Sequence, residues 1–215
     1  MKMRRLAMRF FRLVTFVLLM SLIQFEAAQA QAPQGKPVTV RGKISAIENQ
    51  TLKVTTSAGE VLLKLPDNVR VGGLEAAKLT DITAGNYVGT TAVKQADGNL
   101  KALEVHIFPE SSRGTGEGHR PWDLQPGSTM TNANVEKVEQ VAVEKVQGQL
   151  LTLKYKDGEQ KVFIPPGTPV VKNVPGDRSL LKPGTGVYIA AARGEDGTLT
   201  ATRITAGVGG IMPPM

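Results

Sequence analysis

The chain repeats itself once, at a constant offset of 99 residues. Most of the matched positions are turn residues and alternating apolar residues, which a fold requires and a reaction does not. The longer matches pair Ile44–Ile47 with Val143–Val146, Gln50–Leu52 with Gln149–Leu151, Gly59–Glu60 with Gly158–Glu159, and Asp97–Leu100 with Asp196–Leu199. The repeat therefore predicts two copies of one small domain. It says nothing about a biochemical activity.

The first 30 residues have the composition of a secretory signal peptide. A basic leader, Met1–Arg12, precedes a nearly uncharged apolar stretch, Leu13–Phe25, and then the small-residue site Ala28-Gln29-Ala30. The apolar stretch is shorter than the roughly 20 residues of a membrane-spanning helix, so cleavage after Ala30 is favoured over anchoring. We expect an exported protein, most simply periplasmic, with no membrane span after cleavage.

The predicted leader also holds much of the positive charge. The sequence contains 26 Lys and Arg against 19 Asp and Glu, a net charge of +7. Five of the basic residues and one acid lie in the leader, which leaves 21 against 18, or +3. A chain this close to neutral has little general attraction for nucleic acid, so we expect no such partner. The sequence has no cysteine, which excludes a disulfide framework.

After a lead-in, short alternating apolar segments separated by turn residues are typical of small all-β units. One stretch, Leu74–Leu79, has helical spacing and predicts a short helix. Several strands with one helix is the element order of a small OB-type barrel. We expect an all-β fold of two tandem OB-like Greek-key barrels, each with one short helix, joined by a long ordered loop. The expected boundaries are 1–30 signal peptide, 31–37 flexible lead-in, 38–109 first repeat, 110–134 inter-repeat loop, 135–207 second repeat and 208–215 Pro/Met tail.

The segment 110–134 lacks the strand pattern and holds the most unusual residues. It contains the only tryptophan, Trp122, and one of two histidines, His119, while His106 lies just upstream. Long segments without regular structure inside a compact chain are usually functional or disordered. A flexible spacer does not require a large aromatic side chain such as an indole. We therefore expect this segment to be ordered, with Trp122 buried against a barrel.

Several runs of residues also resemble a known family. They are His106–Glu110, Arg113–Leu124, Pro126–Ala133, Leu153–Gly158, Pro165–Val170 and the Pro-Pro-Met215 ending. With these the chain resembles an exported proteobacterial family of unknown function that has tandem small OB-like barrel domains. The resemblance covers nearly the whole chain after the leader and implies fold and export, with no known activity. Some members are labelled metal ABC transporter permeases, which this sequence does not support.

Metal binding is the sharpest chemical hypothesis. The candidate ligands, all within 18 residues, are His106, Glu110, Glu117, His119 and Asp123. Imidazole and carboxylate groups suit Zn(II) or Cu(II). Strand parity puts Glu104 and His106 on the face opposite Val105, so His106 should face outward, where a loop could reach it. The spacing matches no established metal motif, so the alternative is two histidines hydrogen-bonded within a packed loop.

The sequence contains no recognisable catalytic constellation, since it lacks cysteine and has no serine in a nucleophile signature. We expect a binding or interaction module rather than an enzyme, with a periplasmic protein or small ligand as the unidentified partner. The candidate contact residues are Arg113, Glu117, His119, Arg120, Trp122 and Asp123. The alternative is a periplasmic metal-binding or metal-handling protein that uses the same segment.

Overall fold

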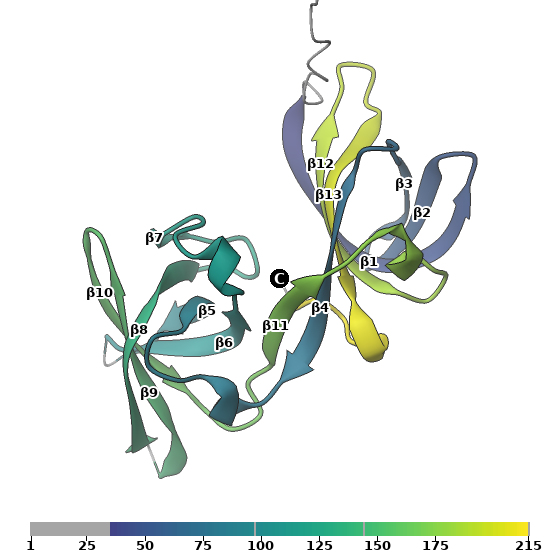
Figure 1. The fold of residues 1–215 in the computed structure, drawn as a ribbon. Coiled ribbons are helices and arrows are strands. Elements are labelled where there is room, and N and C mark those ends of the chain that lie inside the picture. The colour runs from purple at the N-terminus through teal and green to yellow at the C-terminus, as the bar shows by residue number, and fades with distance from the viewer. Residues whose placement is uncertain (1–34, 97, 144, 215) are drawn as a thin grey trace, which may run out of the picture. The chain divides into compact units, whose positions relative to one another are not determined.

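The computed structural model describes residues 35–96, 98–143 and 145–214 (Figure 1). The predicted signal peptide, its cleavage site and most of the lead-in lie outside these residues. The described residues fall within one compact unit, Pro33–Met215. None of the helices among them is long and apolar enough to cross a membrane.

Within the described ranges the fold is all-β, as the sequence predicts, with only short 3₁₀ helices. The first strands are β1 (Lys36–Glu48), β2 (Thr51–Thr56), β3 (Gly59–Lys64), β4 (Arg70–Ala77), β5 (Tyr87–Lys94), β6 (Leu100–Ile107) and β7 (Gly118–Pro121). The later strands are β8 (Ser128–Val143), β9 (Val146–Tyr155), β10 (Gly158–Ile164), β11 (Val170–Pro175), β12 (Gly186–Arg193) and β13 (Leu199–Gly207). The 3₁₀ helices are η1 (Leu79–Asp81), η2 (Glu110–Ser112), η3 (Arg178–Leu180) and η4 (Val208–Gly210).

The strands pair into two closed rings. In ring one, β1 pairs with β2 and β12, β3 pairs with β2 and, in parallel, with β13, and the β12–β13 pair closes the ring. In ring two, β8 pairs with β9 and β5, β10 pairs with β9 and, in parallel, with β6, and the β5–β6 pair closes the ring. The two rings therefore have the same pattern of pairing, in which β8–β10 match β1–β3 and β5–β6 match β12–β13.

Each ring encloses its own apolar core, and each core draws residues from both sequence repeats. Ring one buries, among others, Leu52, Val54, Leu63, Val187, Ile189 and Ile204. Ring two buries, among others, Val88, Val105, Leu151, Leu153, Val162 and Ile164. Full burial of one such side chain contributes roughly 1.5–3 kcal/mol. The cores therefore do not follow the expected boundaries at 38–109 and 135–207, because each ring takes three strands from one repeat and two from the other.

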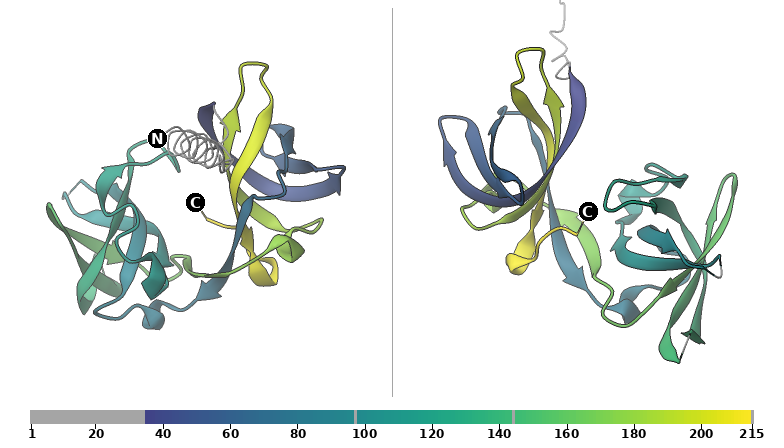
Figure 2. Two further views of the ribbon diagram at one scale, coloured as in Figure 1. Left: turned by 45° about the horizontal axis from the view of Figure 1, so that its top comes forward. Right: turned by 180° about the vertical axis from the view of Figure 1, so that it is seen from behind.

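Two strands carry the chain from one ring to the other (Figure 1). After β3 of ring one, β4 pairs in parallel with β13 and antiparallel with β11, and the chain then enters β5 of ring two. After β10 of ring two, β11 pairs in parallel with β6, and the chain then enters β12 of ring one. Both views in Figure 2 show β4 and β11 side by side. Because they cross as a pair, their backbone groups hydrogen-bond to each other rather than remaining unpaired between the rings.

The prediction of a helix at Leu74–Leu79 is wrong. The segment is strand as far as Ala77, and only η1 follows it. Helical propensity is a weak preference, whereas β4 gains backbone partners on both sides from β11 and β13. Leu74 is fully buried in this pairing. Each ring accordingly has one 3₁₀ turn, η1 or η3, in place of the short helix that the sequence predicted.

The first strands of the two rings are related by an offset of 91 residues rather than 99. Ile44 of β1 pairs with Val54, and Val135 of β8 pairs with Leu153, with a β-bulge directly after Ile44 and after Val135. The partner residues are 99 apart, whereas Ile44 and Val135 are 91 apart. The β8–β9 hairpin is therefore eight residues longer than the β1–β2 hairpin. The gapless alignment of these first strands at offset 99 is wrong.

The inter-repeat loop is shorter than the expected 110–134. It contains η2 and β7, and β8 already begins at Ser128. Residues 128–134 are mostly polar, so they show no apolar alternation, yet they are strand because β5 and β7 pair with them on either side. Gly118 of β7 lies opposite Asn132 of β8. The segment that remains, 113–127, includes a short strand that packs on ring two.

Candidate functional site

A partly open cavity of about 240 Å³, here called the chamber, lies between ring two, the covering segment 113–122 and part of ring one. Strands β6 and β8 supply one wall, and β4, β11, β12 and β13 supply the opposite wall. The side chains that line it are mainly aromatic, basic and amide groups, namely His106, Phe108, Arg120, Trp122, Asn132, Asn173, Tyr188 and Arg203. The chamber is therefore built from segments that are far apart in the sequence.

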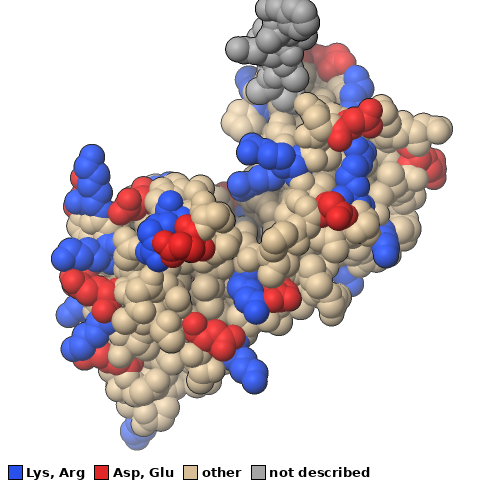
Figure 3. All heavy atoms as spheres, viewed as in Figure 1, with Lys and Arg blue, Asp and Glu red and all other residues tan. Residues whose placement is uncertain are grey.

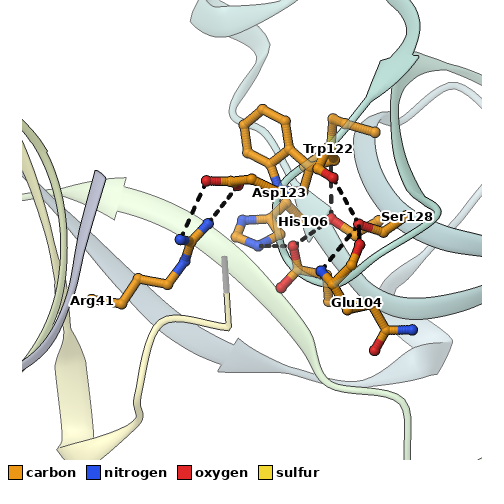
Figure 4. A network of polar contacts seen from close by, with 9 residues as sticks. Arg41, Glu104, His106, Trp122, Asp123 and Ser128 are labelled. Carbon is orange, nitrogen blue, oxygen red and sulfur yellow. Dashed lines mark hydrogen bonds and ion pairs between the residues drawn. The ribbon is translucent and has the colours of Figure 1, made fainter. Parts of the chain in front are cut away.

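Glu104 and His106 of β6 form a buried polar pair beside the chamber (Figure 4). Their exposed fractions are 0% and 1%. Thr91 Oγ1 donates a 2.7 Å hydrogen bond to Glu104 Oε1, and His106 Nε2 lies 3.7 Å from the same oxygen. Val105, between them, belongs to the core of ring two. Strand parity thus predicts the correct face for His106, but the covering segment and ring one bury it.

Several buried polar atoms around the chamber have no hydrogen-bond partner among the described residues. They are Glu104 Oε2, both imidazole nitrogens of His106, Trp122 Nε1, Asn132 Oδ1 and Asn173 Oδ1. Leaving a buried polar group without a partner costs about 1–3 kcal/mol, and such groups are rare in folded proteins. Their concentration around one cavity indicates a surface that can bind a molecule with several hydrogen-bonding groups.

Arginine side chains give the chamber a positive character. The Arg120 guanidinium lies 5.6 Å from the centroid of the Trp122 ring and donates a 2.8 Å hydrogen bond to Gly116 O. Arg203 lines the chamber from β13, and among the described residues the only carboxylate noted beside the lining is that of Glu104, next to His106. On the face shown in Figure 3, basic and acidic side chains are interspersed.

Hydrogen bonds hold the covering segment in place. Tyr87 Oη and Asn132 Nδ2 both donate to Thr115 O, at 3.1 and 3.2 Å. Burial raises the pKa of Tyr87 above its ordinary value, which further favours the protonated phenol. Trp122 N donates to Ser128 O at 2.9 Å, and Ser128 Oγ donates to Trp122 O at 3.0 Å. These contacts fix the segment to ring two, and Trp122 within it is partly buried.

The five candidate metal ligands do not converge. The nearest partners are Arg113 for Glu110 (2.6 Å), the Lys156 amide for Glu117 (3.0 Å), Thr131 for His119 (2.9 Å), Arg41 for Asp123 (2.8 Å) and Glu104 for His106 (3.7 Å). Figure 4 shows Asp123 directed at Arg41 and His106 at Glu104. Across residues 35–96, 98–143 and 145–214, no three His, Asp or Glu side chains could hold a metal ion together.

Of the six candidate contact residues, Arg120 and Trp122 line the chamber. Arg113 instead binds Glu110, Asn134 Oδ1 and Gly85 O on the outside of the covering segment. The hydrogen bond from Arg113 lowers the pKa of the Glu110 carboxyl. The other three candidates, Glu117, His119 and Asp123, bind the partners named above.

Sequence reasoning missed the chamber residues that lie outside the 106–123 segment. Asn132 stands in a polar stretch that was assigned to the loop, and Asn173 and Tyr188 reach the chamber only through the exchange of strands between the rings. The sequence does contain one signal of a polar surface at this place, the parity of β6. Glu104 and His106 alternate with apolar residues in a strand, so two ionisable groups share one face of β6. Such a pair requires either solvent or a polar cover.

Comparison with protein families gives one match. Residues 142–205 match DUF5666, a domain of unknown function. The DUF5666 segment runs from the end of β8 into β13 and covers less than half of the chain. It supplies β9 and β10 to ring two and β12 and most of β13 to ring one, so it corresponds to a sequence repeat and not to a ring. Asn173 and Tyr188 of the chamber lie inside the DUF5666 segment, whereas His106 and Trp122 lie outside it. Comparisons with curated proteins and with solved structures find no match.

Proposed function

We propose that this protein is an exported binding module of the periplasm, built from two OB-like barrels, and that it is not an enzyme. The leader composition supports export. The pairing within each ring supports the OB-like description, because a five-stranded Greek-key barrel is the OB architecture. In this proposal the barrels are not formed by one repeat each. They exchange strands through β4 and β11.

The observation that carries the proposal is the set of buried polar atoms without partners around the chamber. Asn132 Oδ1 and Asn173 Oδ1 can accept hydrogen bonds, and Trp122 Nε1 can donate one. Each His106 nitrogen can donate or accept, depending on its proton. A ligand that satisfies these groups recovers the cost of burying them unpaired. Ligand sites are typically concave surfaces of this kind, mostly apolar with a few directed polar groups.

The lining chemistry favours a small aromatic carboxylate as the ligand. Phe108, Trp122 and Tyr188 offer ring faces and edges, while Arg120 and Arg203 offer cations that suit a carboxylate. A cavity of about 240 Å³ is smaller than the roughly 300–1,000 Å³ of pockets that hold drug-sized molecules. The ligand is therefore the size of a single substituted ring.

The metal-handling alternative has less support, because its five ligands have other partners and do not converge. A calorimetric titration of the metal-free protein with Zn(II) and Cu(II) tests it directly. If the protein is a binding module of the kind proposed, we expect no metal binding that depends on both His106 and His119. Tight metal binding that is lost in both His106→Ala and His119→Ala would favour the metal-handling alternative.

The single tryptophan provides the readout for ligand binding. We expect benzoate and 4-hydroxybenzoate to change Trp122 fluorescence with saturation and to raise the melting temperature. Benzyl alcohol, which has the ring without the charge, should bind more weakly. Because a charge-assisted hydrogen bond contributes about 1.5–3 kcal/mol, Arg120→Gln should weaken benzoate binding by about tenfold or more.

The control variant is Arg193→Gln, because Arg193 is an exposed arginine at the end of β12 and does not line the chamber. It should bind benzoate as the wild type does. Two results would overturn the proposal. One is the absence of any saturable signal with these carboxylates, and the other is an equal loss of affinity in Arg193→Gln and Arg120→Gln.

A further inference from the structure

The longer β8–β9 hairpin creates a second cavity, a groove on ring two that is separate from the chamber. Its volume is about 520 Å³. Its apolar walls are Val141, Val143, Val146, Leu150, Phe163 and Pro165. Val146 is 44% exposed, although burial of a valine side chain is favourable. None of these residues lines the chamber, so the groove is an independent feature.

The corresponding surface of ring one is polar. In ring two the cross-strand pair Leu150–Phe163 forms its floor, whereas the corresponding pair in ring one is Thr51–Lys64. The three valines lie in residues 140–147, the eight-residue extension that distinguishes the β8–β9 hairpin from the β1–β2 hairpin. The apolar floor and the apolar wall therefore occur together, in one ring only. A hairpin that served only to close the barrel would not need either change.

Two lysines add positive charge to the lining of the groove. Lys101 of β6 and Lys161 of β10 line it, and β6 and β10 are neighbouring parallel strands with Lys101 paired to Phe163. Among residues 35–96, 98–143 and 145–214, no ion pair involves either lysine, and no Asp or Glu of these residues lines the groove. A groove with apolar walls and two ammonium groups in its lining is complementary to a molecule with a hydrocarbon tail and an anionic head.

We propose that this groove binds a free fatty-acid-like carboxylate, with the hydrocarbon chain against the valines and Phe163 and the carboxylate at Lys101 and Lys161. The chain buries apolar surface that the hairpin otherwise leaves in water. The ammonium groups select an anionic head over a neutral or cationic one, because like charges in contact are disfavoured. This site is distinct from the aromatic-carboxylate site proposed for the chamber.

Calorimetry with decanoate and the full chain tests the proposal. Decanoate should bind saturably, and decyltrimethylammonium, which has the same tail and the opposite charge, should bind at least tenfold more weakly. The double variant Lys101→Gln/Lys161→Gln should bind decanoate about five- to tenfold more weakly, as expected for two partly exposed ion pairs. Val146→Asp should weaken binding further, because it places a carboxylate in the apolar wall.

Matched controls come from ring one. Leu62 is 55% exposed and occupies the ring-one position that corresponds to Lys161, so Leu62→Asp makes the same kind of change outside the groove. Lys64→Gln removes a lysine there. Both variants should bind decanoate as the wild type does. Equal binding of the anionic and cationic amphiphiles, or equal loss in Val146→Asp and Leu62→Asp, would overturn the proposal. Trp122 fluorescence separates the two sites, since decanoate in the groove should leave it unchanged.

Discussion

Leu74 of β4 pairs with Asn173 of β11, and these two residues occupy the same position in the two sequence repeats, 99 residues apart. A residue that pairs with its own counterpart marks an approximate two-fold axis. The same axis relates the parallel β4–β13 pair to the parallel β11–β6 pair. The two repeats are thus arranged as the two subunits of a strand-exchanged dimer would be, within a single chain. Asn173 also lines the chamber, so the candidate site lies beside this axis.

The exchange predicts that one repeat by itself forms a dimer. A fragment of residues 127–214 contains β8–β13, but β11 extends away from β10 and carries β12 and β13 to the other ring. Two copies can complete both rings by the same exchange, a low-cost route to dimers. Light scattering after size-exclusion chromatography should give twice the fragment mass at micromolar concentration. A folded monomer would show instead that the repeat closes on itself.

Gly42 of β1 should not tolerate a side chain. A Cβ at this position would lie 2.2 Å from Thr55 O, in the backbone of the paired strand. We expect Gly42→Ala to lower the free energy of unfolding by about 1–3 kcal/mol, the usual cost of overpacking. The control is Gly72→Ala, because a Cβ there meets nothing within 4 Å. Urea denaturation of both variants gives the comparison, and an equal loss in the two would contradict the packing argument.

The ion pair between Arg41 and Asp123 should contribute little to stability. Its closest N–O distance is 2.8 Å, but the side chains are 30% and 58% exposed. Exposed pairs of this kind contribute about 0.2–1 kcal/mol. A double-mutant cycle with Arg41→Gln and Asp123→Asn should give a coupling energy in that range, decreasing as salt is added. The Lys53–Glu48 pair on ring one, at 3.1 Å, is the control and should behave in the same way. A coupling that salt does not change would contradict this explanation.

His119 should make the protein less stable in mild acid. Burial lowers the pKa of His119 below its ordinary value, so the folded chain takes up this proton less readily than the unfolded chain. As the pH falls through the unfolded value of about 6.5, the unfolded state binds more protons and the free energy of unfolding decreases until the folded pKa is passed. His119→Gln should flatten this dependence. The effect should be small, because the ring is partly in solvent. Urea denaturation between about pH 5 and 7.5 measures it, and an unchanged slope in the variant would contradict the assignment.

The sequence predicts the parts of the fold that depend on local residues. Gly184 and Gly197 have positive φ angles of 88° and 81°, as glycines in turns should. The all-β class follows from alternation and turn spacing. The strand at Leu74–Ala77 could not be predicted, because its partners are β11 and β13, far along the chain. Strand pairing likewise overrides the polar composition of residues 128–134.

The candidate site was predictable only in part. Arg120 and Trp122 stood out because the segment that carries them is unusual for a β-rich chain. Asn132, Asn173 and Tyr188 did not, since ordinary strand residues become a site only when the topology brings their faces together. The exchange of strands is set by long-range pairing, which has no local signal in the sequence.

The exchange also sets the order in which the two cores can form while the chain is synthesised, starting from its N-terminus. Ring two needs only β5 to β10 and is complete once Ile164 is available, whereas ring one joins β1 to β13 and must wait for Gly207. Strands β1 to β3 therefore remain without their closing partners while most of the chain follows. Contacts between residues this far apart carry a high loop-closure entropy and form slowly. We therefore expect ring one to assemble late in folding, with β1 to β3 exposed to mispairing until it does.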